Sequence, residues 1–244
     1  LRADRKNNFK IHLSENEDVL EKILELIHEH TDLDFKAYKE STVSRRIEHR
    51  IGIVNKSSIN EYYEYLKAHK NEIELIKEDL LIGVTQFFRD FEVWEDVEKN
   101  IIYPLIKNSK SGSTIRVWSA GCSTGEEAYT IAMLFMNAME KMEIKREVKV
   151  FASDTDQSAV SYGASGVYPA SIVTEMPKEY LKRYFFQLAD GSYQVMKELR
   201  SMVVFATHNL IQDPPFSNMD FISCRNMLIY MQNPAQQKAL AFFH

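Results

Sequence analysis

The most constraining feature of the sequence is a short apolar segment that passes through a glycine-containing turn into a helix-forming segment. It reads IRVWSAGCSTGEEAYTIAML and occupies residues 115–134. Residues 115–120 predict a buried strand and residues 126–140 a helix, while Gly121 and Gly125 let a ligand approach the backbone between them. Such a unit begins a parallel, doubly wound sheet, and these sheets bind ligands at this turn. The segment therefore predicts an α/β fold with a cofactor site after its first strand.

Short apolar segments with the length of strands recur after this unit, at residues 148–153, 186–188, 193–196, 202–206 and 219–224. The first and last predict further strands of the parallel sheet, with a helix at 156–163 after the first. The other three surround the turn at Asp190 and Gly191 and predict a small antiparallel β-subdomain at about residues 185–206. A last helix begins at Asn233 and Pro234 and continues to His244.

The amino-terminal part of the chain predicts helices without strands. Capping boxes, in which a side-chain oxygen caps a helix and an acid three residues later reaches back, occur at Ser14–Glu17, Ser58–Glu61 and Asn71–Glu74. Apolar spacing predicts further helices at residues 42–54 and about 91–106. The polar stretch at 108–114 is typical of a linker. We therefore expect a helical domain at 1–107 and an α/β domain at 108–244.

Composition excludes several classes of protein. The net charge of −5 over 244 residues provides no general attraction to nucleic acid or anionic lipid. No apolar run approaches the roughly 20 residues that cross a bilayer, and the opening residues have no leader pattern, so we expect a cytoplasmic protein that does not insert into a membrane. Cys122 and Cys224 are too few for a disulfide framework, and His28 and His30 lack companion metal ligands. We expect no metal site.

Polar residues at the predicted strand ends indicate the kind of ligand. Glu126 and Glu127 begin the helix after the first strand, where they would repel a pyrophosphate and suit a cationic centre. Asp154 closes the second strand, where nucleotide-binding sheets hydrogen-bond a ribose. A hydrolase is a competing interpretation, because residues 121–125 match the G-x-S-x-G nucleophile motif with Ser123 at its centre. The two glutamates oppose it, because they would repel an oxyanion.

Five segments together resemble the chemotaxis receptor glutamate methyltransferases, the CheR family. They are LLIGVTQFFRD at 80–90, VWSAGCSTGEEAYTIAM at 117–133, VFASDTD at 150–156, VVFATHNL at 203–210 and MDFISCRNMLIYM at 219–231. The resemblance implies an amino-terminal helical domain followed by a class I, Rossmann-like methyltransferase domain with a small β-subdomain. It also implies an enzyme that transfers a methyl group from S-adenosylmethionine to glutamates on the cytoplasmic helices of chemoreceptors, leaving S-adenosylhomocysteine.

The resemblance implies a role for each residue that matches the family's motifs. Arg89 would lie close to the transferred methyl group and Tyr230 would face the reacting centre, so both are candidate catalytic residues. Glu126 is similar to the acid that holds the methionine amino group, and Asp154 to the acid on the ribose. The candidate cofactor-binding residues are Gly83, Thr85, Arg89, Gly121, Glu126, Asp154, Asn209, Leu210, Arg225, Asn226 and Met227.

A basic stretch in the helical part is the candidate substrate-binding face. Residues 36–56 carry six lysines and arginines against two glutamates, a local charge of +4 in an acidic chain. Such a face attracts an acidic helical partner, and the family's corresponding domain docks on the receptor's methylation helices. We therefore expect Arg45, Arg46 and Arg50 to contact the receptor, with a solvated helix face as the alternative.

Two departures from the family's pattern leave a second function open. Gly83 stands where many members have a polar residue before V-T-x-F-F-R, and the chain stops at His244, so we expect the domain to be truncated at its carboxyl end. The alternative to an enzyme is therefore a methyltransferase-like module that binds the cofactor or a partner without turnover. Catalysis itself demands no general base, because a glutamate carboxylate is already a nucleophile at neutral pH.

Overall fold

The structure is a computed structural model that describes residues 17–243. The chain forms two compact units, each with its own apolar core. The first unit contains the residues up to Ile82 together with Ile229–Gln236, and the second contains Gly83–Leu228 together with the residues from Gln237 on. The division after residue 82 differs from the boundary at 107 that the sequence predicts.

Helices packed around an apolar core make up the first unit. They are α1 (Glu17–Thr31), α2 (Glu40–Ile53), α3 (Ile59–Ala68) and α4 (Lys70–Leu80), with the 3-10 turn η2 (Phe35–Ala37) after α1. Apolar residues recur at every third or fourth position of these helices, so each helix can bury one face. The fully buried members of this core include Ile23, Ile27, Ile47, Tyr62 and Ile76.

The three capping boxes have different outcomes. Ser58 caps α3, because its hydroxyl accepts a hydrogen bond from the Glu61 amide at 3.2 Å. Asn71 does not cap α4, so that prediction was wrong: α4 begins at Lys70, and His69 holds the cap position without a side-chain hydrogen bond. A single residue separates α3 from α4, so the position of Asn71 already lies within the first turn of α4. Ser14 lies outside the described residues, so its cap stays a prediction.

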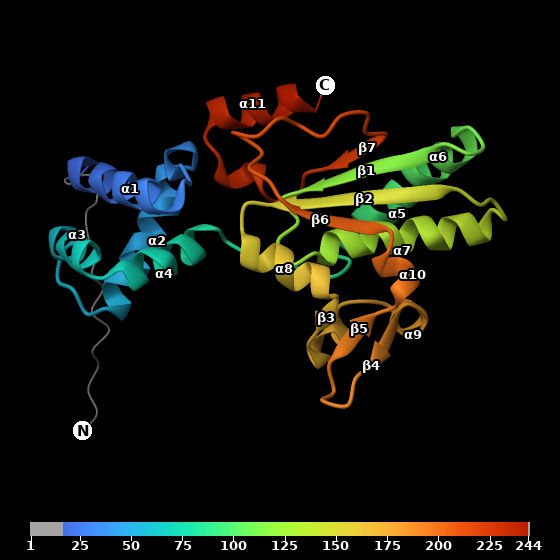
Figure 1. The fold of residues 1–244 in the computed structure, drawn as a ribbon, viewed down its shortest axis with the longest axis horizontal. Helices are drawn as coiled ribbons and strands as arrows, with labels where there is room; N and C mark the ends of the chain where they lie inside the picture. The colour runs from blue at the N-terminus through green and yellow to red at the C-terminus, as the bar shows by residue number, and fades with distance from the viewer. Residues whose placement is uncertain (1–16, 244) are drawn as a thin grey trace. The chain divides into compact units, whose positions relative to one another are not determined.

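A parallel sheet forms the centre of the second unit (Figure 1). Its strands follow the order β6-β2-β1-β7 and are β1 (Thr114–Ala120), β2 (Glu147–Asp154), β6 (Val203–Thr207) and β7 (Phe221–Ser223). All neighbouring pairs run parallel. The connections after β1 and β2 contain α7 (Glu126–Lys141) and α8 (Gln157–Ser165). The predicted strand–helix alternation and the Rossmann-like fold class are confirmed.

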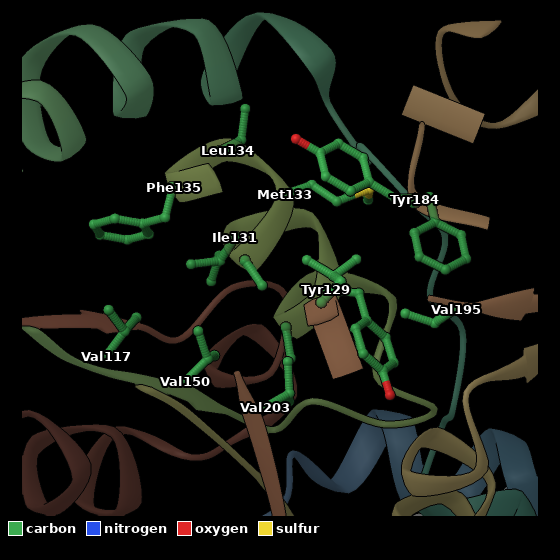
Figure 2. Packing of buried hydrophobic residues seen from close by; sticks show 14 of the residues in the cluster. Val117, Tyr129, Ile131, Met133, Leu134, Phe135, Val150, Tyr184, Val195 and Val203 are labelled. Atoms are coloured by element: carbon green, nitrogen blue, oxygen red, sulfur yellow. The ribbon is translucent and has the colours of Figure 1, made fainter. Parts of the chain in front are cut away.

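The helix α7 covers one face of this sheet (Figure 2). Val117, Val150 and Val203 come from three neighbouring strands and belong to the same buried cluster as Ile131 and Phe135 of α7. Burying one such side chain contributes roughly 1.5–3 kcal/mol. This layer therefore stabilises the strand ends that carry the candidate site.

A small antiparallel sheet follows α8, in the order β3-β5-β4. Its elements and the short helices around it are β3 (Val167–Tyr168), η4 (Ala170–Thr174), α9 (Lys178–Tyr184), β4 (Phe185–Gln187), β5 (Tyr193–Val195) and α10 (Lys197–Arg200). The predicted β-subdomain at 185–206 differs from this in two ways. It lacks β3, and it includes β6, which belongs to the parallel sheet because it pairs along its whole length with β2.

The helical segment that the sequence predicts at 91–106 belongs to the second unit. It consists of α5 (Phe91–Val97), the π-helical turn η3 (Glu98–Ile102) and α6 (Tyr103–Asn108). The wider turn accommodates Pro104, whose ring clashes with the carbonyl four residues earlier in a regular helix. Trp94, Ile102 and Ile106 lie in the core of the second unit. This buried face, and not the polar stretch after it, decides the domain to which the segment belongs.

The last described elements are the 3-10 turn η5 (Leu228–Tyr230) and α11 (Asn233–Phe242). The start of α11 agrees with the helix predicted from Asn233 and Pro234. Within residues 17–243, no helix is both long enough and apolar enough to cross a membrane.

Candidate functional site

The carboxyl ends of the parallel strands share one edge of the sheet. β1 lies between β2 and β7, so the order of the strands reverses at β1. Open α/β sheets bind their ligands at this reversal, because the loops that leave the two neighbouring strands diverge there. The residues that follow β1, β2, β6 and β7 are therefore the ones from which a site can be built.

The turn after β1 is packed closely by side chains from β6 and from the loop after β7. Gly121 has a φ of 74° and Gly125 a φ of 94°, a conformation that favours glycine. A Cβ atom on Gly121 would lie 2.6 Å from Sδ of Met227, and one on Gly125 would lie 2.7 Å from the ring of Phe205. Packing thus requires both glycines, whatever ligand approaches the turn.

Asp154 ends β2 and anchors the turn after β1. Its carboxylate accepts hydrogen bonds from the amides of Ser123 at 2.8 Å and Asp156 at 3.0 Å. Burial raises the pKa of the Asp154 carboxyl, and these backbone hydrogen bonds act in the opposite direction. A carboxylate has about four acceptor positions, so Asp154 retains capacity for ligand hydroxyl groups.

The two glutamates that begin α7 have different surroundings. The carboxylate of Glu126 accepts a hydrogen bond from the hydroxyl of Thr124 at 2.7 Å, within its own turn. The carboxylate of Glu127 accepts from the hydroxyls of Ser119 on β1 at 3.0 Å and Ser223 on β7 at 2.9 Å. Glu127 therefore joins the two strands between which the order of the sheet reverses.

Two positive charges also act on Glu127. Burial raises the pKa of its carboxyl, while the two serine hydroxyls and the charges of Arg225 and Arg89 act in the opposite direction. The sequence indicates that both glutamates suit a cationic centre, and it names Glu126 as the cofactor-binding residue. The feature that distinguishes Glu127 is the pair of serines on two strands, since Ser119 and Ser223 are register partners between β1 and β7.

The segment before α5 lies against the turn after β1. The hydroxyl of Ser123 donates a hydrogen bond to the carbonyl of Gly83 at 3.3 Å. The guanidinium of Arg89 donates to a carbonyl of its own segment at 2.9 Å. Arg225, just after β7, donates to the carbonyl of Arg89 at 3.0 Å and to the carboxylate of Asp90 at 2.8 Å. These bonds place Arg89 at the carboxyl edge of the sheet.

The loop after β6 begins beside Asp154 and folds back on itself. The amide of His208 donates to the carbonyl of Asp154 at 2.9 Å. The amide of Asn209 donates to the carboxylate of Asp213 at 2.7 Å. Leu210 is buried in the cluster on the other face of the sheet from α7. Both predicted residues of this loop thus follow the strand that neighbours β2.

All eleven predicted cofactor-binding residues belong to the second unit and lie before α5, at the end of β2 or after β1, β6 and β7: Gly83, Thr85, Arg89, Gly121, Glu126, Asp154, Asn209, Leu210, Arg225, Asn226 and Met227. Tyr230 belongs to the first unit, where its carbonyl accepts a hydrogen bond from the amide of Lys39 at 2.7 Å. Arg45 and Arg46 also belong to the first unit, on α2. The roles of these residues remain predictions.

Arg50 lies in the interior of the first unit and not on its surface. Its guanidinium donates two hydrogen bonds, at 2.9 and 2.7 Å, to the carboxylate of Glu72, which also accepts from the hydroxyl of Tyr62 at 3.0 Å. Only 8% of the Arg50 surface is exposed. Arg50 therefore does not belong to the candidate substrate-binding face, and its charge stabilises the contact between α2 and α4 instead.

The geometry around Ser123 argues against a hydrolase. A serine nucleophile needs a base that accepts a hydrogen bond from its hydroxyl. The hydroxyl of Ser123 instead donates to the carbonyl of Gly83, and the amide of Ser123 donates to the carboxylate of Asp154. In the part of the chain that the structure describes, no group of histidines, cysteines and carboxylates could hold a metal ion.

Both units match models of known protein families. Residues 83–244 match the model described as the CheR methyltransferase, SAM binding domain. Residues 18–81 match the model described as the CheR methyltransferase, all-alpha domain. The two matches meet where the structure divides into its units.

Relatives cover most of the chain. A protein of Rhodobacter capsulatus, described as an uncharacterized 104.1 kDa protein in the hypE 3' region, is 40% identical over 93% of this chain, which spans only 24% of it. The chemotaxis protein methyltransferase of Borreliella burgdorferi is 32% identical over 92% of this chain and 81% of its own length. Chemotaxis protein methyltransferase 2 of Vibrio cholerae is 30% identical over 89% of this chain and 76% of its own length. The chain belongs to the CheR methyltransferase family, whose larger domain binds S-adenosylmethionine.

Proposed function

We propose that this chain transfers a methyl group from S-adenosylmethionine to the side-chain carboxylates of glutamates on the cytoplasmic helices of a chemoreceptor. One observation carries the proposal: the carboxyl of Asp154 ends β2, the carboxyl of Glu127 at the start of α7 bonds to serines on β1 and β7, and the charge of Arg89 acts on Glu127. The printed names of the Borreliella and Vibrio relatives support a chemotaxis substrate.

The chemistry of the residues at this edge fits the cofactor. Asp154 has acceptor positions left for the ribose hydroxyls. Glu127 offers a half-buried carboxylate for the ammonium of the methionine part, and a cation beside it would lower its raised pKa. Asn209 and Leu210 would line the adenine. The remaining contacts would come from Gly83, Thr85, Gly121, Arg225, Asn226 and Met227.

Alignment of the acceptor is the main task left to the protein. The cofactor supplies an electrophilic methyl group on a sulfonium. The acceptor carboxylate is ionised at neutral pH, so no residue has to remove a proton from it. Arg89 would orient this carboxylate through two charge-assisted hydrogen bonds. Catalysis would then rest on proximity and charge placement.

The acidic helices of the receptor would bind to the basic face of α2. Arg45 is exposed and Arg46 is partly exposed on this helix. Positive charges on one helix face attract acidic partners and raise the association rate at low salt. With Arg50 buried, the proposed face rests on Arg45 and Arg46.

The experiment measures transfer of radiolabelled methyl groups to a purified chemoreceptor cytoplasmic fragment. Methyl esters release methanol in alkali, so volatile alkali-labile label identifies carboxyl methylation. We expect the 244-residue chain to methylate the fragment. Arg89→Ala should lower kcat about 100-fold, with a smaller loss of affinity for S-adenosylhomocysteine, because it removes the group that aligns the acceptor while the cofactor keeps its contacts with Asp154 and Glu127.

Arg183→Ala is the matched control, because Arg183 is an exposed arginine on α9. It should leave both activity and affinity unchanged. Equal losses of kcat and cofactor affinity in Arg89→Ala would contradict an orienting role. A chain that binds S-adenosylhomocysteine but methylates nothing would instead support the binding-module alternative.

A further inference from the structure

The loop that carries Arg89 has an unusual backbone conformation. Phe88 has a φ of 51° and Asp90 a φ of 58°, so a left-handed residue stands on each side of Arg89. Residues other than glycine rarely adopt this conformation. It persists only where surrounding groups hold the backbone in place, and such strain concentrates at functional sites.

Side chains from three separate elements hold this loop. The carboxylate of Glu175 accepts a hydrogen bond from the amide of Phe87 at 3.1 Å. The hydroxyl of Thr130 on α7 accepts one from the amide of Phe88 at 3.2 Å. Arg225, after β7, donates to the carbonyl of Arg89 at 3.0 Å. Three consecutive residues of the loop are thus fixed from three directions.

The first of these contacts comes from the small antiparallel sheet. Glu175 directly follows η4, in the connection between β3 and β4. The same sheet also holds the side chain of Phe87, which is fully buried. Its ring contacts the ring of Tyr168 on β3 edge-on, with centroids 4.9 Å apart, and that of Phe185 on β4 at 5.4 Å. The small sheet and its connection therefore contact the loop through one carboxylate and two aromatic rings.

We propose that Glu175 is a positioning residue for the methyl-transfer reaction, acting through Arg89. Its carboxylate fixes the amide of Phe87, two residues before Arg89, and so sets the direction of the guanidinium. The inference rests on the proposed function. Thr130 and Arg225 have further partners, since Thr130 also donates to the carbonyl of Glu126 and Arg225 lies over the ring of Trp94.

Of the three side chains that hold the loop, Glu175 is the most suitable for substitution. It is only half-buried and its neighbour Thr174 is exposed, so the change should disturb the core little. Removing its carboxylate leaves the ring cluster around Phe87 in place. Glu175→Gln keeps an oxygen that accepts the same hydrogen bond, and Glu175→Ala removes it. Glu179→Ala, at an exposed glutamate in the first turn of α9, is the matched control.

The experiment compares these variants by methyl transfer to the receptor fragment and by binding of S-adenosylhomocysteine. We expect Glu175→Ala to lower kcat about tenfold, as loss of one hydrogen bond to a charged group does, with KM and the dissociation constant changed less than about twofold. Glu175→Gln should restore most of kcat. In an Arg89→Ala background, Glu175→Ala should have almost no further effect, because two residues that act as one unit are not additive.

Each other outcome contradicts a distinct statement. An unchanged kcat in Glu175→Ala, beside an active parent chain, would overturn the positioning role alone. A loss that adds fully to that of Arg89→Ala, or that Glu175→Gln does not repair, would show a general structural effect and would also overturn it. A parent chain without methyl transfer would overturn the proposed function, and the positioning role with it.

Discussion

Glu126 and Glu127 are neighbours in the sequence, but their carboxylates have different partners. Successive residues of a helix point about 100° apart, so adjacent acids in a first turn face different parts of the molecule. Glu126 bonds to a hydroxyl of its own turn, whereas Glu127 reaches serines on both β1 and β7. A cationic group bound where the strand order reverses would therefore meet Glu127.

Exchanging each glutamate for glutamine separates these roles. We expect Glu127→Gln to weaken binding of S-adenosylhomocysteine about tenfold or more, because it removes a charge-assisted contact to the ammonium while keeping the size of the side chain. Glu126→Gln is the matched control and should change the affinity less than about threefold. Isothermal titration calorimetry measures both dissociation constants. A larger loss in Glu126→Gln would reverse the assignment.

At this scale the sequence predicts much of the candidate site. The turn after β1 and Asp154 lie where strand-end reasoning puts them, because a strand–turn–helix segment has only one favourable path into a parallel sheet. The sequence could not predict which of Glu126 and Glu127 contacts both strands. That contact depends on Ser223, which is distant in sequence and lies beside β1 only because of the register of β7.

The helix α2 divides its arginines between core and solvent. Val43, Ile47 and Arg50 lie at positions i, i+4 and i+7, so they share the buried face. Arg45 is exposed. The spacing of the apolar residues predicts that Arg50 lies on the buried face of the helix. The local net charge of the segment does not show this.

Reversing the charge of Arg45 tests the basic face. We expect Arg45→Glu to lower kcat/KM for the receptor fragment about fivefold at low salt, and less at high salt, because steering between charged surfaces is screened by ions. Affinity for S-adenosylhomocysteine should not change. Lys22→Glu makes the same charge change at an exposed position on α1 and is the control. Equal losses in the two variants would indicate a general charge effect and no docking face on α2.

For two other elements, the local sequence pattern predicts the element but not the part of the fold against which it packs. The strand β6 follows the small antiparallel sheet in sequence, but it pairs with β2, because its apolar residues complete the larger core. The segment of α5, η3 and α6 precedes the polar linker but packs against α7. In both cases the element was predicted and its partner was not, since partners depend on contacts between distant residues.

The molecule has two separate apolar cores, so its two units can unfold as separate cooperative units. The core of the first unit contains Ile47 and Tyr62, and that of the second contains Trp94 and Phe135. Chains with more than one core depart from two-state unfolding, because each core can melt as its own cooperative unit. A ligand that binds the native form of one unit stabilises that unit by mass action.

Calorimetry should therefore resolve two unfolding transitions, of which S-adenosylhomocysteine moves only one. At 100 times its dissociation constant the ligand adds about 2.7 kcal/mol, which should raise the midpoint of the second unit by roughly 5–10 °C. Asp154→Ala should lower that midpoint without ligand, because two amides lose their acceptor, and should abolish most of the shift. An equal shift of both transitions, or a full shift in Asp154→Ala, would contradict a cofactor site confined to the carboxyl edge of the parallel sheet.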